Sequence, residues 1–261
     1  MITPEAEARL RTALVSAAGG YLRNPLRQAN VTCAVCTTPV DGFRCCFSCN
    51  AHRVHAGLAD AVAPLTYAVG LRQSGYIMRG YKAKPPVEEH RRIVAMLLIL
   101  ALSTHTGCAG VLLNAPVTHW TTVPSLPARS GEHPLHQLVK GTAPGTEIPL
   151  VASPNVADPR SVNPDHYTAH GLLPRGSHVL VMDDTWARGG HAQSAALALR
   201  RAGAARVSVL VVARWINEGF ADNRKFLVDL ADRDFDPLFC PWTGETCPDF
   251  EGRHDRATTY V

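Results

Sequence analysis

The chain lacks a long hydrophobic run, and few of its residues are charged. The apolar stretch over residues 93–102 is much shorter than the ~20 residues that cross a bilayer, so we expect no membrane span. The first residues include acids and no apolar signal-peptide core, which predicts a cytoplasmic protein. Charged residues make up 18% of the chain and hydrophobic residues 46%, a balance that favours a packed core over disorder. Internal repeats and low-complexity segments are also missing.

A large excess of positive charge is missing too. The formal net charge is +4, which permits phosphate-bearing ligands but is no signature of nucleic-acid binding. The length of 261 residues suffices for one sizeable α/β domain and a small appendage. We divide it into a helix and metal-binding element over 1–55, an α/β domain over 56–216, and a helix and tail over 217–261.

The chain is well supplied with cysteine. Eight cysteines in a protein expected in the cytoplasm favour metal ligands over disulfides. Two CxxC pairs, nine residues apart, supply four thiolates: Cys33, Cys36, Cys46 and Cys49. Four thiolates complete a tetrahedral shell, so we predict a closed structural zinc site in a small ribbon or knuckle. Cys45 competes with Cys46, and His52 and His55 are alternative ligands, although surface histidines are the simpler interpretation.

Three further cysteines lie outside residues 33–49. Cys240 and Cys247 are half of a second metal site, a redox pair or two packed thiols. Packing is the favoured interpretation, because free cysteine behaves as a small hydrophobe. Cys108 is expected in the core.

Hydrophobic periodicity and turn residues predict alternating helices and strands. Helices are predicted over residues 3–22, 71–81, 86–104, 134–140, 193–202 and 223–232. Strands are predicted over residues 65–69, 110–114, 147–152, 179–182 and 207–213. The order strand, helix, strand over 179–213, with Gly203 ending the helix, predicts a parallel sheet with a right-handed crossover.

The most informative segment follows the strand over 179–182. Asp183 and Asp184 end this strand, and Gly189 and Gly190 open the next helix. Adjacent carboxylates are costly to bury without a ligand, a cation or donors. A glycine loop at a helix amino terminus offers free N–H groups to a phosphate. Together they predict a ribose-5-phosphate site; the simpler alternative is an acidic pair that only caps the loop and helix.

The segment VLVMDDTWARGGH resembles the motif of type I phosphoribosyltransferases that binds phosphoribosyl diphosphate (PRPP). With the cysteine pairs, the chain resembles ComF-type (GntX-like) proteins, which join a four-cysteine zinc element to a phosphoribosyltransferase domain. Further similar segments follow in that family's order between residues 31 and 214: residues 67–82, residues 111–117, residues 129–131, Arg160, Asn163 and Tyr167.

The resemblance implies a type I phosphoribosyltransferase fold, a parallel sheet flanked by helices. Its activity would be magnesium-dependent transfer of phosphoribosyl from PRPP to an unidentified nitrogenous acceptor. Asp183 and Asp184 would accept hydrogen bonds from the ribose hydroxyls, directly or through Mg²⁺. The 5′-phosphate would lie in a loop of seven residues: Thr185, Trp186, Ala187, Arg188, Gly189, Gly190 and His191. The pyrophosphate would meet four residues: Ala115, Pro116, Lys82 and Arg129.

The phosphate loop departs from the family pattern. Threonines that usually flank the glycine are replaced here by Ala187, Arg188 and His191, so hydroxyl donors are lost while the glycines remain. Arg188 can supply a charge-assisted bond instead. Trp186 can stack on a ligand or simply pack in the core.

Two functions of other classes also fit the sequence. The zinc element could bind DNA or a protein partner while the PRPP site senses a nucleotide metabolite. Only Arg44, Arg53 and two histidines give that element positive charge, which is little for DNA binding. Alternatively, Phe239, Trp242 and Phe250 could form an exposed apolar patch through which the tail makes a homo-oligomer.

Overall fold

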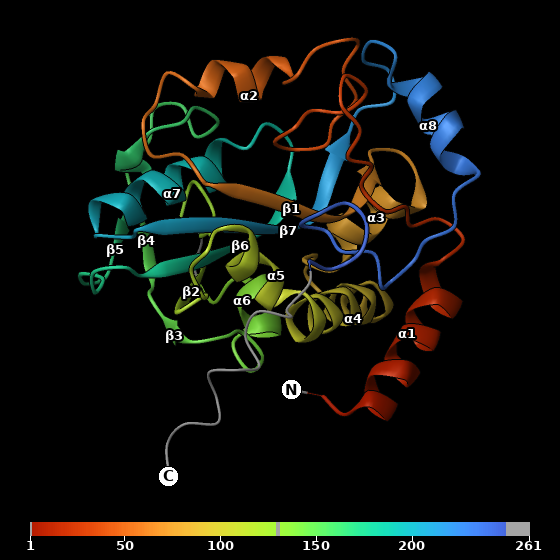
Figure 1. Cartoon of the computed structure of the whole chain (residues 1–261), viewed down its shortest axis with the longest axis horizontal. Coiled ribbons are helices and arrows are strands. Elements are labelled where there is room, and N and C mark those ends of the chain that lie inside the picture. The colour runs from red at the N-terminus through yellow and green to blue at the C-terminus, as the bar shows by residue number, and fades with distance from the viewer. Residues whose placement is uncertain (1, 129–130, 249–261) are drawn as a thin grey trace.

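The protein forms a five-stranded parallel sheet in the order β1-β7-β6-β2-β3 (Figure 1). The structure, a computed structural model, describes residues 2–128 and 131–248. The strands are β1 (Ala61–Val69), β2 (His119–Thr122), β3 (Thr146–Glu147), β6 (His178–Trp186) and β7 (Arg206–Ile216). A separate antiparallel pair joins β4 (Leu150–Ala152) to β5 (Tyr167–Ala169). The predicted α/β class is therefore confirmed.

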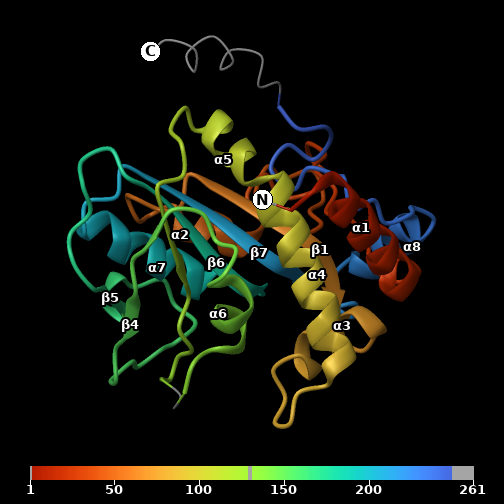
Figure 2. The ribbon, with the colours of Figure 1, turned by 90° about the horizontal axis from the view of Figure 1, so that it is seen from below.

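Helices pack on both faces of this sheet (Figures 1 and 2). One face is covered by α1 (Pro4–Ala18), α3 (Gln73–Gly80), α4 (Glu88–Thr104), α5 (Thr106–Leu112) and α6 (Pro134–Val139). The other face is covered by α7 (Gly190–Arg201) and by a cysteine-rich element that contains α2 (Phe47–His52). Helix α8 (Asn223–Ala231) packs beside the ends of β1 and β7, and a short 3-10 turn, η1 (Pro164–His166), contacts α7.

Side chains along the central strands alternate between the two faces of the sheet, and each set packs against one helical layer. In β6, Leu180 and Met182 face α4, while Val179 and Val181 face α7. Successive side chains of a strand point to opposite faces, and a strand buried on both faces is apolar throughout. The unit β6–α7–β7 follows as predicted, and Gly203 after the helix has a φ of +106°, a conformation that glycine adopts without strain.

Three strand predictions are wrong in part. Residues 110–114 were expected to be a strand, but α5 occupies most of this range and the strand β2 follows it. A short apolar run does not distinguish a buried helix from a buried strand. Pro149 interrupts the strand expected over 147–152, because proline has no N–H for the ladder. The strand expected to end at residue 182 continues to Trp186, paired with β7 throughout.

Both ends of the described chain pack into the core of the sheet. Helix α1 lies on α4, and Asn24 exchanges two hydrogen bonds with the backbone of Asp236, of 2.7 and 2.9 Å. Trp242, expected on an exposed patch, is 6% exposed and belongs to the core beside α4. Phe250 lies outside the described residues.

Within the described segments, no single helix has the length and apolar character of a membrane span. Only α4 and α5 together reach that threshold by length and composition, and they are bent by 48° at their junction.

Candidate functional site

An open groove lies at the carboxyl end of β6. Its volume is about 1920 Å³. Its lining comes from the end of β6 and start of α7, the segment after β2, the cysteine-rich element and the loop before α8. The carboxyl edge of a parallel sheet is where α/β proteins usually bind ligands, since loops and helix amino termini converge there.

The acidic pair lies inside the last residues of β6, on opposite sides of the strand. Asp184 is 7% exposed, and its Oδ2 accepts hydrogen bonds from the Tyr81 hydroxyl at 2.7 Å and from Lys82 Nζ at 2.5 Å. Asp183 is half-buried, and its Oδ1 accepts a 2.8 Å bond from the Asp184 backbone N–H. The segment after α3 therefore supplies the donors that buried carboxylates require.

The two carboxylates differ in their electrostatics. Burial raises the pKa of Asp183 to about 7, and the negative charge of Asp184 adds to this effect. Burial also acts against ionisation of Asp184, but the charge and hydrogen bond of Lys82 and the Tyr81 hydroxyl outweigh it. The pKa of Asp184 therefore lies below its ordinary value. At neutral pH Asp184 is ionised and paired with Lys82, whereas the carboxyl group of Asp183 is present in both its protonated and its ionised form.

The glycine pair allows the chain to turn sharply from β6 into α7. Gly189 has a φ of +86°, and a Cβ there would lie 2.2 Å from the Trp186 ring. A Cβ on Gly190 would lie 2.2 Å from the carbonyl oxygen of Arg160. Both positions exclude a side chain. The first N–H groups of α7 have no partner within the helix, and its first residues line the groove.

The other loop residues separate into lining and packing residues. Thr185, Ala187, Arg188 and His191 line the groove. Trp186 is 1% exposed and lies beneath the turn, which decides between its two expected roles: it packs and does not present its ring to a ligand. Burial lowers the pKa of His191, so its imidazole is neutral at pH 7 and adds no charge for a phosphate.

The structure does not bring all the expected residues together. The Ala115 carbonyl accepts a 2.8 Å bond from His178 Nδ1, at the amino end of β6, so Ala115 and Pro116 lie near the opposite end of this strand from the acids. They do not line the groove. The strand β2 begins after Ala115 and Pro116, so these residues precede its amino end and do not follow its carboxyl end. Arg129 lies outside the described residues.

The segment after β2 takes the place expected for Ala115 and Pro116. The Val123 N–H donates to the carbonyl of Met182 at 3.0 Å, and Val123, Pro124 and Ser125 line the groove beside the acids. These residues were not predicted from the sequence, because β2 (HWTT) is polar and lacks the pattern of a buried strand. The signal available was the proline that follows it.

Arginines add positive charge around the groove. Arg188 and Arg160 both line it, the first from the exposed loop and the second from the segment that contacts Gly190. Arg214 on β7 is 6% exposed and donates a 2.8 Å bond to the Trp186 carbonyl, which fixes the end of β6. The groove thus places the two carboxylates of β6 near several cations.

Four cysteines lie in the element that forms one wall of the groove, and Cys46 among them lines it; we call the group the groove-side cluster: Cys33, Cys36, Cys46 and Cys49. Their sulfur atoms all lie within 4.8 Å of one another, close enough to hold one metal ion. Cys36 Sγ and Cys46 Sγ are 3.8 Å apart, close to the edge of a tetrahedral zinc–thiolate site of about 3.8 Å. Cys46, not Cys45, belongs to the group, and His52 and His55 do not.

A second group lies on the opposite face of the sheet; we call it the tail cluster: His105, Cys108, Cys240 and Cys247. Its four ligand atoms also lie within 4.8 Å of one another. Cys108 is fully buried, as expected, and its sulfur lies within 4.8 Å of the other three ligand atoms.

Fold and site together define an α/β protein with a parallel sheet, a carboxylate-bearing groove at its carboxyl edge, and two cysteine-rich groups that can hold metal ions. No family model matches the chain, and no curated protein matches it significantly.

Proposed function

We propose that the groove binds PRPP with Mg²⁺ and that the protein, on a type I phosphoribosyltransferase fold, transfers phosphoribosyl to a nitrogenous acceptor. The observation that carries this proposal is the position of Asp183 and Asp184 beside the glycine-started α7, at the end of one strand. The ordered resemblance to ComF-type proteins supports it.

Each part of PRPP has a matching group. The 5′-phosphate meets the open N–H groups at the start of α7, with Arg188 as the charged donor that replaces the missing hydroxyls. The ribose hydroxyls meet the carboxylates of Asp183 and Asp184. The pyrophosphate meets the segment 123–125 and Lys82, whose Nζ reaches Asp184.

The carboxylates suit a reaction in which positive charge develops on ribose. As pyrophosphate leaves, the ribosyl carbon becomes cationic, and fixed negative groups nearby stabilise that charge. Asp183 is the oxygen ligand best placed for Mg²⁺, which would neutralise pyrophosphate charge when bound. Lys82 keeps Asp184 ionised before the ligand arrives.

The groove-side cluster would hold zinc. Four thiolates without an open position form a closed site, so the ion stabilises the element and does not react. Because Cys45 and Cys46 line the groove, a zinc-stabilised element would form the wall next to which the acceptor enters.

Calorimetric titration of the full chain with PRPP and Mg²⁺ tests the proposal. We expect saturable binding that Asp183→Asn and Arg188→Ala each weaken by at least about tenfold, the scale of a lost charge-assisted bond. The matched control is Asp232→Asn, a substitution of an exposed carboxylate at the end of α8, which should bind like wild type. Absence of binding by wild type at saturating PRPP would refute the proposal.

A second measurement separates catalysis from sensing. Pyrophosphate release is followed with PRPP and a panel of amines and nucleobases. Release that requires both an acceptor and Asp183 supports transfer. PRPP binding without release under any acceptor would instead assign the groove to ligand sensing.

A further inference from the structure

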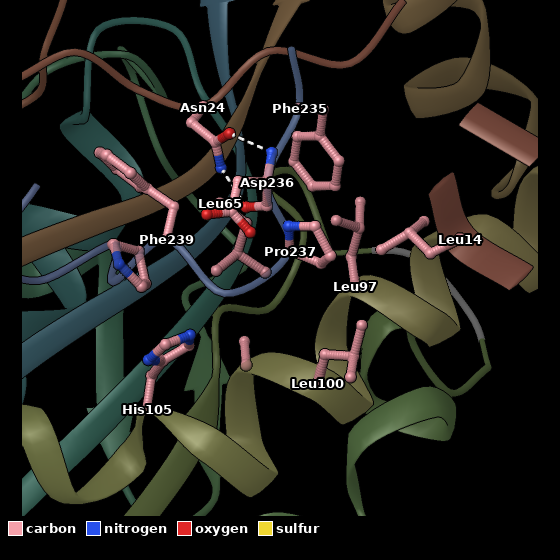
Figure 3. Close-up of a pocket in the computed structure, with 12 residues that line it drawn as sticks. Leu14, Asn24, Leu65, Leu97, Leu100, His105, Phe235, Asp236, Pro237 and Phe239 are labelled. Atoms are coloured by element: carbon pink, nitrogen blue, oxygen red, sulfur yellow. Dashed lines mark hydrogen bonds between the residues drawn. The ribbon is translucent and has the colours of Figure 1, made fainter. Parts of the chain in front are cut away.

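The tail cluster joins two parts of the chain that are far apart in sequence. His105 and Cys108 lie at the junction of α4 and α5, and Cys240 and Cys247 lie in the tail. His105 Nδ1 is 3.2 Å from Cys247 Sγ, across 142 residues of chain. Figure 3 shows His105 at the end of α4, lining a small pocket that the tail residues Asp236 and Phe239 also line.

We propose that the tail cluster is a second structural zinc site, formed by one histidine and three cysteines, which fastens the tail to the α4–α5 junction. One imidazole and three thiolates are a common ligand set for zinc in closed, tetrahedral sites. Soft sulfur ligands with one nitrogen disfavour Mg²⁺ and Ca²⁺, which prefer oxygen.

The backbone around the ligands is shaped to present them. His105 ends α4 and begins α5, and the Cys108 N–H donates to the His105 carbonyl at 3.1 Å, so both side chains leave the same turn. In the tail, the Gly244 N–H donates to the Cys240 carbonyl and the Cys240 N–H to the Glu245 carbonyl. These bonds curl residues 240–247 into a loop whose two sulfurs face the junction.

The imidazole of His105 is buried and has few hydrogen-bond partners. His105 is 3% exposed; its Nδ1 lies against a thiol, and within the described chain its Nε2 has no hydrogen-bond partner. Thiols are weak hydrogen-bond partners, so a buried imidazole in these surroundings is poorly satisfied. A metal ion bound at Nδ1 would replace this weak thiol contact with a strong partner.

Arg27 supplies charge that suits two metal–thiolate groups. Its guanidinium donates to the carbonyls of Val62 and Pro241, and no salt bridge joins it to a carboxylate in the part of the chain that is described. It lies within electrostatic reach of Cys240 on one side and of Cys33 and Cys36 on the other. Zinc with three or four thiolates carries net negative charge, which a half-buried cation between the two groups would balance.

Metal analysis of the full-length protein tests this inference. We expect two zinc ions per chain in wild type and one in Cys247→Ser and in His105→Ala. His105→Cys, which keeps a ligand, should retain two. Cys45→Ser is the matched control, since Cys45 belongs to neither group, and it should also retain two.

The two sites are distinguished by their own variants. Cys36→Ser should lose one ion, and Cys36→Ser combined with Cys247→Ser should lose both. In Cys247→Ser we expect the thermal midpoint to fall by at least about 5 °C, as for loss of an ordering ion in a domain of this size. The outcome does not depend on PRPP binding.

If a variant fails to fold, the zinc content and intact mass of the wild-type protein still test the inference. Two zinc ions per chain, with an intact mass that corresponds to eight free thiols after metal removal, supports the inference. One zinc ion in wild type overturns it, and a mass lower by two hydrogens would instead assign the tail cysteines to a disulfide. Iron or copper in place of the second zinc would overturn the choice of metal.

Discussion

The two cysteine groups lie on opposite faces of one sheet and each can hold a metal ion, but their ligands come from different parts of the chain. The groove-side cluster is drawn from residues 33–49, whereas the tail cluster joins residues 105–108 to residues 240–247. Ligands that are close in sequence come together at a small cost in chain entropy. Even when unfolded, such a segment retains part of its affinity for metal. Closing a long loop costs more entropy, so a distant group binds well only after the fold has formed. Metal binding at the tail cluster would therefore require the folded chain more strictly than binding at the groove-side cluster.

The largest effect should come from Cys36→Ala in the groove-side cluster. Cys36 is fully buried, and little apolar core lies within residues 31–52 to hold them when the metal is lost. We expect the free energy of unfolding to fall by at least about 4 kcal/mol, as measured by urea denaturation. Proteolysis should then cut this element first. Unchanged urea midpoints would show that packing alone holds the element and would remove the contrast between the two clusters.

The next effect tests whether packing alone holds the tail. Trp242 is 6% exposed in the core beside α4, and Trp242→Ala should lower the free energy of unfolding by about 3 kcal/mol. The control is Phe220→Ala, at a side chain that is 68% exposed, with an expected change under about 0.5 kcal/mol. If Trp242→Ala also releases one zinc ion, packing and metal binding in the tail are one cooperative unit. Independent responses would contradict that view.

A smaller effect is expected at Arg27, between the two clusters. Arg27→Met should cost about 2 kcal/mol, because the Val62 and Pro241 carbonyls lose their charged donor. Urea denaturation measures this change, and Arg233→Met, at an exposed position, is the control. We also expect faster zinc release to a chelator from both clusters. An effect on only one cluster would show that the guanidinium serves that side alone.

The smallest effect separates the groove from both clusters by pH. The raised pKa of Asp183, about 7, makes its ionisation destabilising: this cost is present above pH 7 and disappears as pH falls toward the ordinary value for Asp. Asp183 alone should make the protein about 1.4 kcal/mol more stable at pH 6 than at pH 8. Asp184, whose pKa is lowered, stays ionised throughout and contributes no slope there.

Lower pH would destabilise a metal-bound cluster, because protons compete with metal for thiolates. This effect on stability is opposite in sign to that of Asp183. The difference between wild type and Asp183→Asn isolates the groove, because both proteins share the clusters. Stability curves at pH 6, 7 and 8 measure it. Equal curves for the two proteins would show that Asp183 has an ordinary pKa.

Much of the fold follows from local sequence. The βαβ unit around residues 179–213 was predictable because an apolar strand, a glycine turn and an amphipathic helix each have a local signature. Errors fell where the signature is ambiguous or misleading. The apolar residues 110–114 form part of α5, and the polar β2 is buried because it pairs with β6.

The candidate site was also predictable only in part. Asp183, Asp184 and the glycine pair were found because they are adjacent in the chain and meet at one strand end. The ion pair of Lys82 with Asp184 and the segment 123–125 were not, because parallel strands bring together residues that are far apart in sequence.

The sequence by itself determined the α/β class and the four groove-side cysteines, because each depends on spacing within one short segment. Only the tertiary structure decided that Cys108, Cys240 and Cys247 meet at His105, that Trp242 is buried, and that Ala115 lies at the far end of the sheet. These are non-local contacts, selected by packing of the whole chain.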